Sequence, residues 1–155
     1  MPAAANASTP RPFRAIFVGG FLVGVIDLVY AILVYSPKHP IRIGQAVASG
    51  LLGAKSFTMG WTSAALGVVL HFTIAFGAAT VFYLASRKMR FLLDRPILFG
   101  LIYGALVYGF MHVVVIPLSA VAHGHTPLIY QVCEFVEHWF GVGLPISLST
   151  RRYAG

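Results

Sequence analysis

The sequence has few charged residues and very few acidic ones. Of its 155 residues, 10% are charged, only 4 are Asp or Glu, and 58% are hydrophobic. A soluble domain typically carries about 25% charged residues, and it needs polar surface to stay dispersed. The composition therefore excludes an ordinary soluble domain and predicts a small integral membrane protein of one domain.

Cysteine is nearly absent too. The single cysteine, Cys133, cannot form an intrachain disulfide, so the sequence does not constrain the redox compartment. A lone cysteine inside an apolar run is most often a small apolar filler. The chain also lacks a nucleophile elbow, a phosphate-binding loop and a zinc-protease motif, so no catalytic motif points to an enzyme.

The net charge of +7 is carried by basic residues at the ends of apolar runs. In a soluble protein such a charge would suggest binding to nucleic acid. Here membrane topology accounts for it, because Lys and Arg gather on the cytoplasmic side of membrane spans. We therefore expect the lipid bilayer to be the partner, and no nucleic acid.

Four segments are long and apolar enough to cross a membrane, which takes about 20 mostly apolar residues. They cover residues 15–35, 58–85, 96–120 (opened by Pro96) and 127–148. The first is too long for a signal-peptide core, and no small-residue cleavage site follows it, so we expect it to be retained. Residues 1–14 are predicted to be a disordered cytoplasmic N-terminus. The predicted fold is an all-α membrane protein, a four-transmembrane-helix bundle forming one domain over residues 15–150.

The segment between the first two spans, residues 41–54, is too short to cross a membrane and carries Arg42, Gln45 and Ser49. Its apolar residues recur at helical spacing, which is typical of an amphipathic helix on a membrane surface. We predict a short interfacial helix here. A simple extension of the second span is the alternative.

Lys and Arg are distributed unevenly between the two sides of a four-span arrangement. Eight accompany the termini and the loop between the second and third spans: Arg11, Arg14, Arg87, Lys88, Arg90, Arg95, Arg151 and Arg152. Three fall on the other side: Lys38, Arg42 and Lys55. Because the richer side is normally cytoplasmic, we predict a multi-pass protein with both termini inside and the loop of His123 and His125 outside. The cluster at residues 87–95 is also expected to attract anionic lipid.

Small residues recur at every fourth position in three of the predicted spans, and this spacing lets membrane helices approach closely. The predicted packing glycines are Gly20, Gly24, Gly60, Gly67, Gly100, Gly104 and Gly109. The same faces would equally serve a second copy of the chain or a partner protein. A homo-oligomer, or a structural or assembly subunit of a membrane complex, is therefore one functional alternative.

The strongest functional signal is a set of ionisable residues inside the predicted spans. The set comprises Asp27, His71, His112, Glu134, Glu137 and His138. Ionisable groups in hydrocarbon are costly and usually face a partner or a water-filled cavity. With a period of 3.6, all but Glu137 fall on the small-residue faces of their helices, which predicts a shared interior site. Glu134 and His138 are spaced i, i+4 and are expected to pair, while Glu137 is offset.

Two interpretations of this set are static. One is a structural network that holds the helices in register through hydrogen bonds, with nearby tyrosines as further members: Tyr30, Tyr103 and Tyr108. The other is a transition-metal site for zinc, copper or iron, and less readily haem, in a helical bundle. Its ligands would be His71, His112, Glu134 and His138.

Two further interpretations involve chemistry. Chains of Asp, Glu and His carry protons in pumps and transporters, and Pro117 and Pro145 would loosen the helix ends of such a path. An enzyme would need a metal-activated water with Glu137 as its base. The sequence leaves an enzymatic activity open and favours a role without one.

Residues 70–152 show a recognisable order of motifs: His71, a basic helix end, the Gly-Leu-Ile-Tyr-Gly run at 100–104, His112, Pro117-Leu118, Thr126-Pro127, Glu134, His138 and Arg151-Arg152. In this order the segment resembles the YagU-like family of small proteobacterial inner-membrane proteins. The resemblance implies a bacterial inner-membrane location and a link to acid resistance or envelope stress, with no established biochemical activity. It also marks His71, His112, Glu134 and His138 as matching positions. The family's larger outward segment after the first span is reduced here to residues 36–57.

Overall fold

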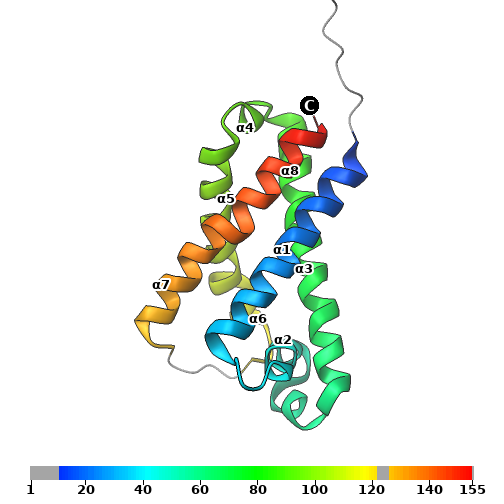
Figure 1. Ribbon diagram of the computed structural model, residues 1–155, viewed down its shortest axis with the longest axis vertical. Helices are drawn as coiled ribbons and strands as arrows, with labels where there is room; N and C mark the ends of the chain where they lie inside the picture. The colour runs from blue at the N-terminus through cyan, green and yellow to red at the C-terminus, as the bar shows by residue number, and fades with distance from the viewer. Residues whose placement is uncertain (1–10, 122–125, 155) are drawn as a thin grey trace, which may run out of the picture.

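The computed structural model describes residues 11–121 and 126–154, and every regular element within them is a helix. Long helical runs lie side by side along the long axis of the molecule and are connected at its two ends (Figure 1). The elements are α1 (Pro12–Tyr35), α2 (Ile41–Leu52), η1 (Gly53–Thr58), α3 (Gly60–Lys88), α4 (Phe91–Asp94), α5 (Pro96–Phe110), η2 (Met111–Val115), α6 (Ile116–Leu118), α7 (Leu128–Glu137), η3 (His138–Gly143) and α8 (Leu144–Ala154). Of these, η1 is a 3-10 helix, and η2 and η3 are π-helices. The predicted all-α architecture is confirmed.

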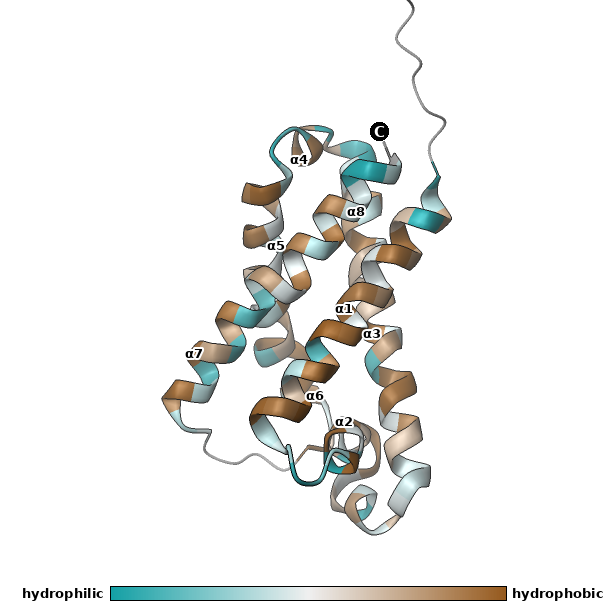
Figure 2. Ribbon diagram, in the orientation of Figure 1, coloured by the Kyte–Doolittle hydropathy of each residue, from teal (hydrophilic) through white to brown (hydrophobic). Residues whose placement is uncertain are grey.

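Among the described residues, three helical segments are long and apolar enough to cross a membrane: Pro12–Tyr35, Gly60–Lys88 and Pro96–Leu118. They correspond to the first three predicted spans. At about 1.5 Å per residue, the 24 residues of α1 extend about 36 Å, which exceeds a hydrocarbon core of roughly 30 Å. Hydrophobic residues predominate along these helices (Figure 2). Many of their side chains are exposed, such as Val69 at 63%. A surface of this kind suits lipid better than water.

The last helical run, α7–η3–α8, packs against α1 and α5. It is not among the segments that qualify as spans by length and composition in the part of the chain that is described. Its end returns to the beginning of α1, where the backbone N–H of Arg11 donates to the carbonyl of Tyr153 at 2.7 Å. The described chain therefore begins and ends at the same end of the bundle.

The buried core lies where α1, α3 and the last helical run meet. Its fully buried members are Val23, Ala75, Ala79, Phe82, Val142 and Ile146. Buried hydroxyl groups beside it bond to carbonyls of their own helix, as Ser86 does to Tyr83 at 2.7 Å and Thr150 to Ile146 at 2.8 Å. These bonds satisfy polar groups that apolar side chains shield from solvent.

The short helix α2 is separate from α3 and is not an extension of it. Gly53 and Gly60, at the two ends of the turn that joins these helices, both have φ of 59°, a conformation that glycine adopts readily. Gln45 of α2 is buried and its amide donates to the carbonyl of Gly60 at 3.1 Å. The alternative of a longer second span is therefore wrong, and the position of α2 at a membrane surface stays a prediction.

Two of the predicted glycine pairs lie at helix contacts. On α1, a Cβ added to Gly20 or Gly24 would overlap an aromatic ring of α3. On α5, a Cβ added to Gly104 would overlap the carbonyl group of His138, and Gly100 is equally close to the last helical run. These four glycines bring α1 against α3 and α5 against η3, as their spacing predicted.

Gly67 also lies at a helix contact, and its partner is α2. A Cβ on Gly67 would overlap the carbonyl of Gly44, and a Cβ on Gly44 would lie 2.6 Å from the carbonyl oxygen of Ala64. In contrast, no described atom lies within 4 Å of a Cβ placed on Gly60 or Gly109. Their prediction as packing residues is wrong: Gly60 provides a positive φ, and Gly109 faces open space.

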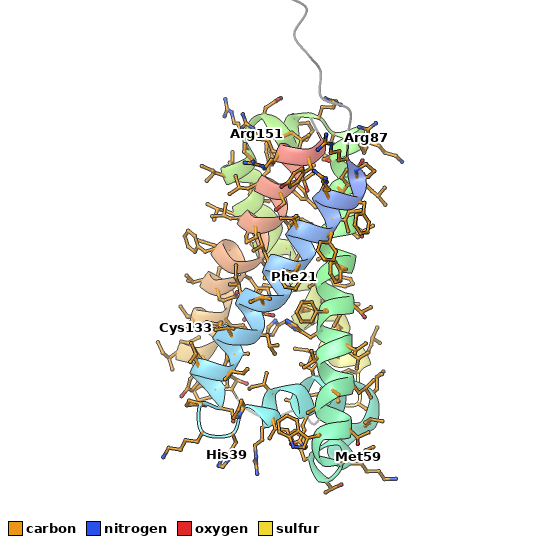
Figure 3. The ribbon with its side chains drawn as sticks, turned by 45° about the vertical axis from the view of Figure 1, so that its right-hand side comes forward. Phe21, His39, Met59, Arg87, Cys133 and Arg151 are labelled. Atoms are coloured by element: carbon orange, nitrogen blue, oxygen red, sulfur yellow. The ribbon has the colours of Figure 1, made fainter. Side chains whose placement is uncertain are left out.

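Basic residues gather at one end of the bundle. Arg87 and Arg151 lie at the end where the described chain begins and finishes, and His39 and Met59 lie at the other (Figure 3). The connections place the eight basic residues listed above near Arg87 and Arg151, and the remaining three near His39. The folded chain thus places the eight basic residues at one end and the three at the other, which is the uneven distribution from which the orientation was predicted.

Candidate functional site

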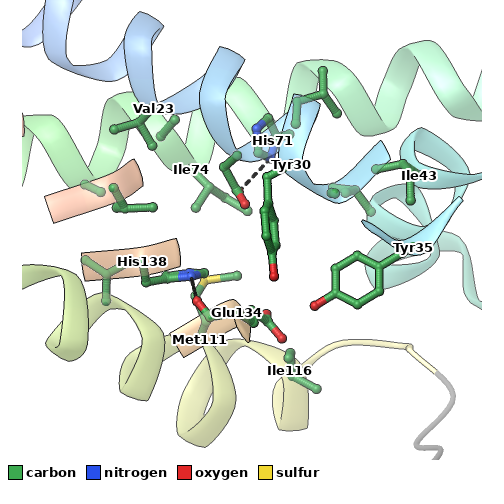
Figure 4. Close-up of a pocket in the computed structure, with 18 residues that line it drawn as sticks. Val23, Tyr30, Tyr35, Ile43, His71, Ile74, Met111, Ile116, Glu134 and His138 are labelled. Carbon is green, nitrogen blue, oxygen red and sulfur yellow. Dashed lines mark hydrogen bonds and ion pairs between the residues drawn. The ribbon is translucent and has the colours of Figure 1, made fainter. Parts of the chain in front are cut away.

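The first His–carboxylate pair joins α1 to α3. Nδ1 of His71 lies 3.8 Å from Oδ2 of Asp27, and the two side chains are 12% and 27% exposed (Figure 4). The other ring nitrogen of His71, Nε2, is 2.9 Å from the carbonyl oxygen of Gly24, one turn before Asp27 on α1. Both ring nitrogens therefore face the same helix, which fixes the orientation of the imidazole.

The second pair joins η2 to α7. Nε2 of His112 lies 3.9 Å from Oε2 of Glu134, and both side chains are about one-third exposed. Nδ1 of His112 is 3.1 Å from the carbonyl oxygen of Tyr108 on its own helix. The Tyr108 ring lies against His112 with centroids 4.1 Å apart, so it holds the imidazole from one side.

The third pair is formed by neighbours in sequence. Nδ1 of His138 lies 3.2 Å from Oε2 of Glu137 and 2.9 Å from the carbonyl oxygen of Glu134. Both side chains are buried, at 9% and 6% exposed. A Cβ on Gly141 would overlap the Glu137 carboxylate, so the absence of a side chain at Gly141 makes room for this acid.

The carbonyl contacts decide where the protons lie. A carbonyl oxygen only accepts hydrogen bonds, so Nε2 of His71 and Nδ1 of His112 must each carry a proton. In a neutral imidazole the other nitrogen is then a bare acceptor, and in both rings it faces a carboxylate. At 3.8 and 3.9 Å, the ring nitrogen and the carboxylate oxygen of each pair are too far apart for a direct hydrogen bond. Each pair therefore places a free ring nitrogen opposite an acid.

A cavity of about 220 Å³ lies between α1, α2, α3, α5 and α7. Asp27, His71, Glu134 and His138 line it, and the hydroxyl ends of Tyr30 and Tyr35 point into it (Figure 4). Apolar side chains such as Val23, Ile74 and Val142 form the rest of its wall. Since a water molecule occupies about 30 Å³ in the liquid, the cavity has room for several. His112 and Glu137 are not in its lining, and each contacts a residue that is, Glu134 or His138.

The structure distributes the six predicted residues into three pairs. Within the described residues, no three or more His, Cys, Asp or Glu side chains gather so that they could hold a metal ion. The proposed ligand set of His71, His112, Glu134 and His138 is therefore not assembled around one point. His123 and His125 lie outside the described residues.

One predicted pairing is wrong. The carboxylate of Glu134 faces His112, and it is Glu137 that faces His138. Nδ1 of His138 contacts the backbone carbonyl of Glu134, while the Glu134 side chain extends across to His112 on the neighbouring helical run. His138 also begins a π-helical segment, η3. His112 lies in the other π-helix, η2. Single π turns inside α-helices are frequent at functional sites, and both of these carry a histidine of the cluster.

The tyrosines of the cluster were predicted only in part. Tyr30 and Tyr108 were expected members, and the structure places both there. Tyr103 instead donates its hydroxyl to the carbonyl of Ala78 at 2.7 Å and joins α5 to α3. Tyr35 was not predicted as a member of the cluster, because it is the last residue of its predicted span. Its position two helical turns beyond Asp27, on the same side of α1, could have indicated that it belongs to the cluster.

No family model, curated protein or solved structure matches the chain. The resemblance to the YagU-like family thus stays a prediction, and the functional argument is carried by the geometry of these residues.

Proposed function

We propose that the chain is a small multi-pass protein of the bacterial inner membrane whose interior His–carboxylate pairs hold and relay protons. The observation that carries the proposal is the fixed orientation of His71 and His112. Each ring donates one N–H to a backbone carbonyl and turns its other nitrogen to an acid, Asp27 or Glu134. Ionisable residues within a membrane mark a functional site by default, and such chains of His and carboxylates are typical of proton paths.

The proposed topology has four crossings, with both termini in the cytoplasm and α2 at the outer surface. It is supported by the eight basic residues at the end of the bundle where the described chain begins and ends, against three at the other. Asp27 is then about 12 Å from the outer end of α1, given about 1.5 Å per residue. The cavity lies in the outer half of the bundle, within reach of protons from outside.

The cavity is the proposed route between the pairs. Asp27 and His71 lie on one wall, Glu134 and His138 lie on another, and Tyr30 and Tyr35 reach into the space between them. Water in this space would carry protons between groups too far apart to bond directly. The resemblance to the YagU-like family adds acid or envelope stress as the proposed physiological setting.

A structural network is the second candidate, and one observation favours it. Two of the pairs bridge different helices, Asp27–His71 from α1 to α3 and His112–Glu134 from η2 to α7. Such bridges would hold the helices in register without moving any proton. The experiment has to separate these two roles.

Proton flux into liposomes that contain the purified protein tests the proposal. A pH gradient is applied, and an internal pH-sensitive dye reports flux for the wild type, Asp27→Asn and Glu134→Gln. Asp94→Asn is the matched control, because Asp94 is an exposed acid at the other end of the bundle and loses the same charge. We expect flux in the wild type and in Asp94→Asn, and a loss of at least about tenfold in the other two, a typical effect of removing a proton-transfer group.

Unchanged flux in Asp27→Asn and Glu134→Gln would reject the relay. Absence of flux in the wild type, combined with a lowered unfolding temperature in both variants, would leave the structural network as the function of the pairs. Infrared spectroscopy gives an independent reading: loss of a carboxylic-acid carbonyl band in Asp27→Asn or Glu134→Gln would show that the pair holds its proton on the acid.

A further inference from the structure

A second site lies at the basic end of the bundle, away from the cavity. A groove of about 470 Å³ opens there between the beginning of α5 and the end of α8. Two arginines, Arg95 and Arg151, flank it, and its wall continues along Ile97, Leu98 and Leu101 of α5. The groove is therefore cationic at one end and apolar along the rest of its length.

A buried hydrogen bond brings the two arginines to the same groove. The hydroxyl of Ser147, which is fully buried, donates to the carbonyl of Pro96 at 2.7 Å and ties α8 to the first turn of α5. Arg95 directly precedes Pro96, and Arg151 follows Ser147 by four residues, one turn further along the same face of α8. This contact between the helices thus holds the backbone positions of Arg95 and Arg151 relative to one another.

No acidic group among the described residues neutralises the charge of these arginines. Asp94 is the one acidic residue at this end in the sequence, against eight Lys and Arg. Among residues 11–121 and 126–154, every ion pair is formed by a histidine, and none involves an arginine. Arg95 and Arg151 are both exposed, so their guanidinium groups are free to bind an anion.

The apolar part of the groove is exposed as well. Ile97 is 62% exposed and Leu98 is 47% exposed, and Leu101 continues the same face one turn later. These side chains lie on a segment that is apolar enough to cross a membrane, so a hydrocarbon chain is the neighbour they suit. A ligand for the whole groove must combine an anionic group with such a chain.

We propose that this groove binds an anionic phospholipid, with its phosphate between Arg95 and Arg151 and an acyl chain along Ile97, Leu98 and Leu101. Arginine suits this task because its planar guanidinium forms paired hydrogen bonds to phosphate oxygens. The inference is independent of proton relay. It is also more specific than a general attraction of lipid to the basic cluster, because it selects Arg151 of α8 and leaves out Arg87 and Arg90.

Native mass spectrometry of the full-length protein in mild detergent tests the site. Phosphatidylglycerol is titrated against phosphatidylcholine with the same acyl chains, and glycerol 3-phosphate serves as the headgroup without a chain. The test variant is Arg95→Gln/Arg151→Gln. The matched control is Arg87→Gln/Arg90→Gln, which removes the same charge from the same end of the bundle.

We expect phosphatidylglycerol to bind the wild type at least about tenfold more tightly than phosphatidylcholine does, and the test variant to lose about tenfold in affinity. The control should change by less than about threefold, since distant surface charges are largely screened. An equal loss of affinity in both variants would show that the overall charge of this end attracts the lipid without a specific site, and it would overturn the proposal. Equal binding of phosphatidylcholine, or of glycerol 3-phosphate, would overturn it too.

Two further variants keep the test decisive if the double glutamine variant does not fold. Arg95→Lys/Arg151→Lys keeps both charges and loses the paired hydrogen bonds, so a partial loss of affinity is expected and no loss would contradict the site. Ile97→Ala/Leu98→Ala should weaken phosphatidylglycerol, because it removes apolar contact with the chain. Unchanged affinity in this variant would show that the chain does not occupy the groove.

Discussion

Nδ1 of His138 lies 3.2 Å from Oε2 of Glu137, and the two side chains are only 9% and 6% exposed. The same nitrogen is 2.9 Å from the carbonyl oxygen of Glu134, so its N–H bonds to that carbonyl while the ring also lies against the carboxylate. Neither carboxylate oxygen of Glu137 has a hydrogen-bond partner among the described residues. The imidazole of His138 is therefore the group that makes the burial of this acid tolerable.

Replacement of His138 by alanine should destabilise the protein strongly. The change removes the group that faces Glu137 and leaves a buried acid without a partner, which typically costs about 3–5 kcal/mol. Glu137→Gln should cost less, because its amide keeps the shape and removes the charge. Unfolding temperatures in detergent micelles, followed by circular dichroism, measure both effects.

The double variant Glu137→Gln/His138→Ala should be more stable than His138→Ala alone, because the orphaned charge is gone. As its control, Glu134→Gln/His138→Ala should show no such rescue, since the Glu134 carboxylate faces His112. Simple additivity of the Glu137 and His138 effects would mean that the two side chains do not interact.

Much of the fold follows from local patterns in the sequence. The apolar runs predict the three spans, and Pro96 predicts where the third begins, because both depend on composition and backbone chemistry. The contact of Gly67 with Gly44 could not be predicted in the same way. The contact depends on the turn between the two helices, and the path of that turn depends on positive φ angles at Gly53 and Gly60. The spacing of residues along either helix gives no information about this path.

The sequence predicted which residues belong to the site, but it did not predict correctly which of them pair with one another. Depth and helix face select Asp27 and His71, and the structure brings them together. The pairing in the last run failed because the Glu134 side chain faces His112 on another helical run, and the spacing of residues along one helix does not predict such a contact. The two π-helices did have a local signal: η2 and η3 each end two residues before a proline, Pro117 or Pro145. Proline lacks an N–H and crowds the carbonyl four residues earlier, which favours a wider turn there.

His71 should differ from His112 and His138 in which ring nitrogen carries the proton. The carbonyl contacts predict a proton on Nε2 of His71 and on Nδ1 of His112 and His138. Nitrogen-15 NMR of histidine-labelled protein in micelles distinguishes these forms. Asp27→Asn should keep the proton on Nε2 of His71, because the bond to Gly24 remains. A proton found only on Nδ1 of His71 would contradict the geometry of the first pair.

Gly67→Ala should destabilise the protein, and Gly109→Ala should not. A methyl group on Gly67 would overlap the carbonyl of Gly44 and push α2 away from α3, and such overpacking costs about 1–3 kcal/mol. Gly109 has open space at the same position, and alanine is favoured over glycine within a helix by about 1 kcal/mol. Thermal unfolding compares the two variants, and equal unfolding temperatures would argue against the close contact of α2 with α3.

Cysteine labelling should place the ends of the bundle on opposite sides of the membrane. Cys133, the single native cysteine, is first replaced by alanine, and one cysteine is then introduced at Lys38 or at Lys88. A membrane-impermeant maleimide applied to cells with a permeabilised outer membrane should label Lys38→Cys, and should label Lys88→Cys only after the inner membrane is opened. The reason is that the end with eight basic residues should be cytoplasmic. The reverse pattern would invert the orientation and move the cavity to the cytoplasmic half, which would remove the outside as its source of protons.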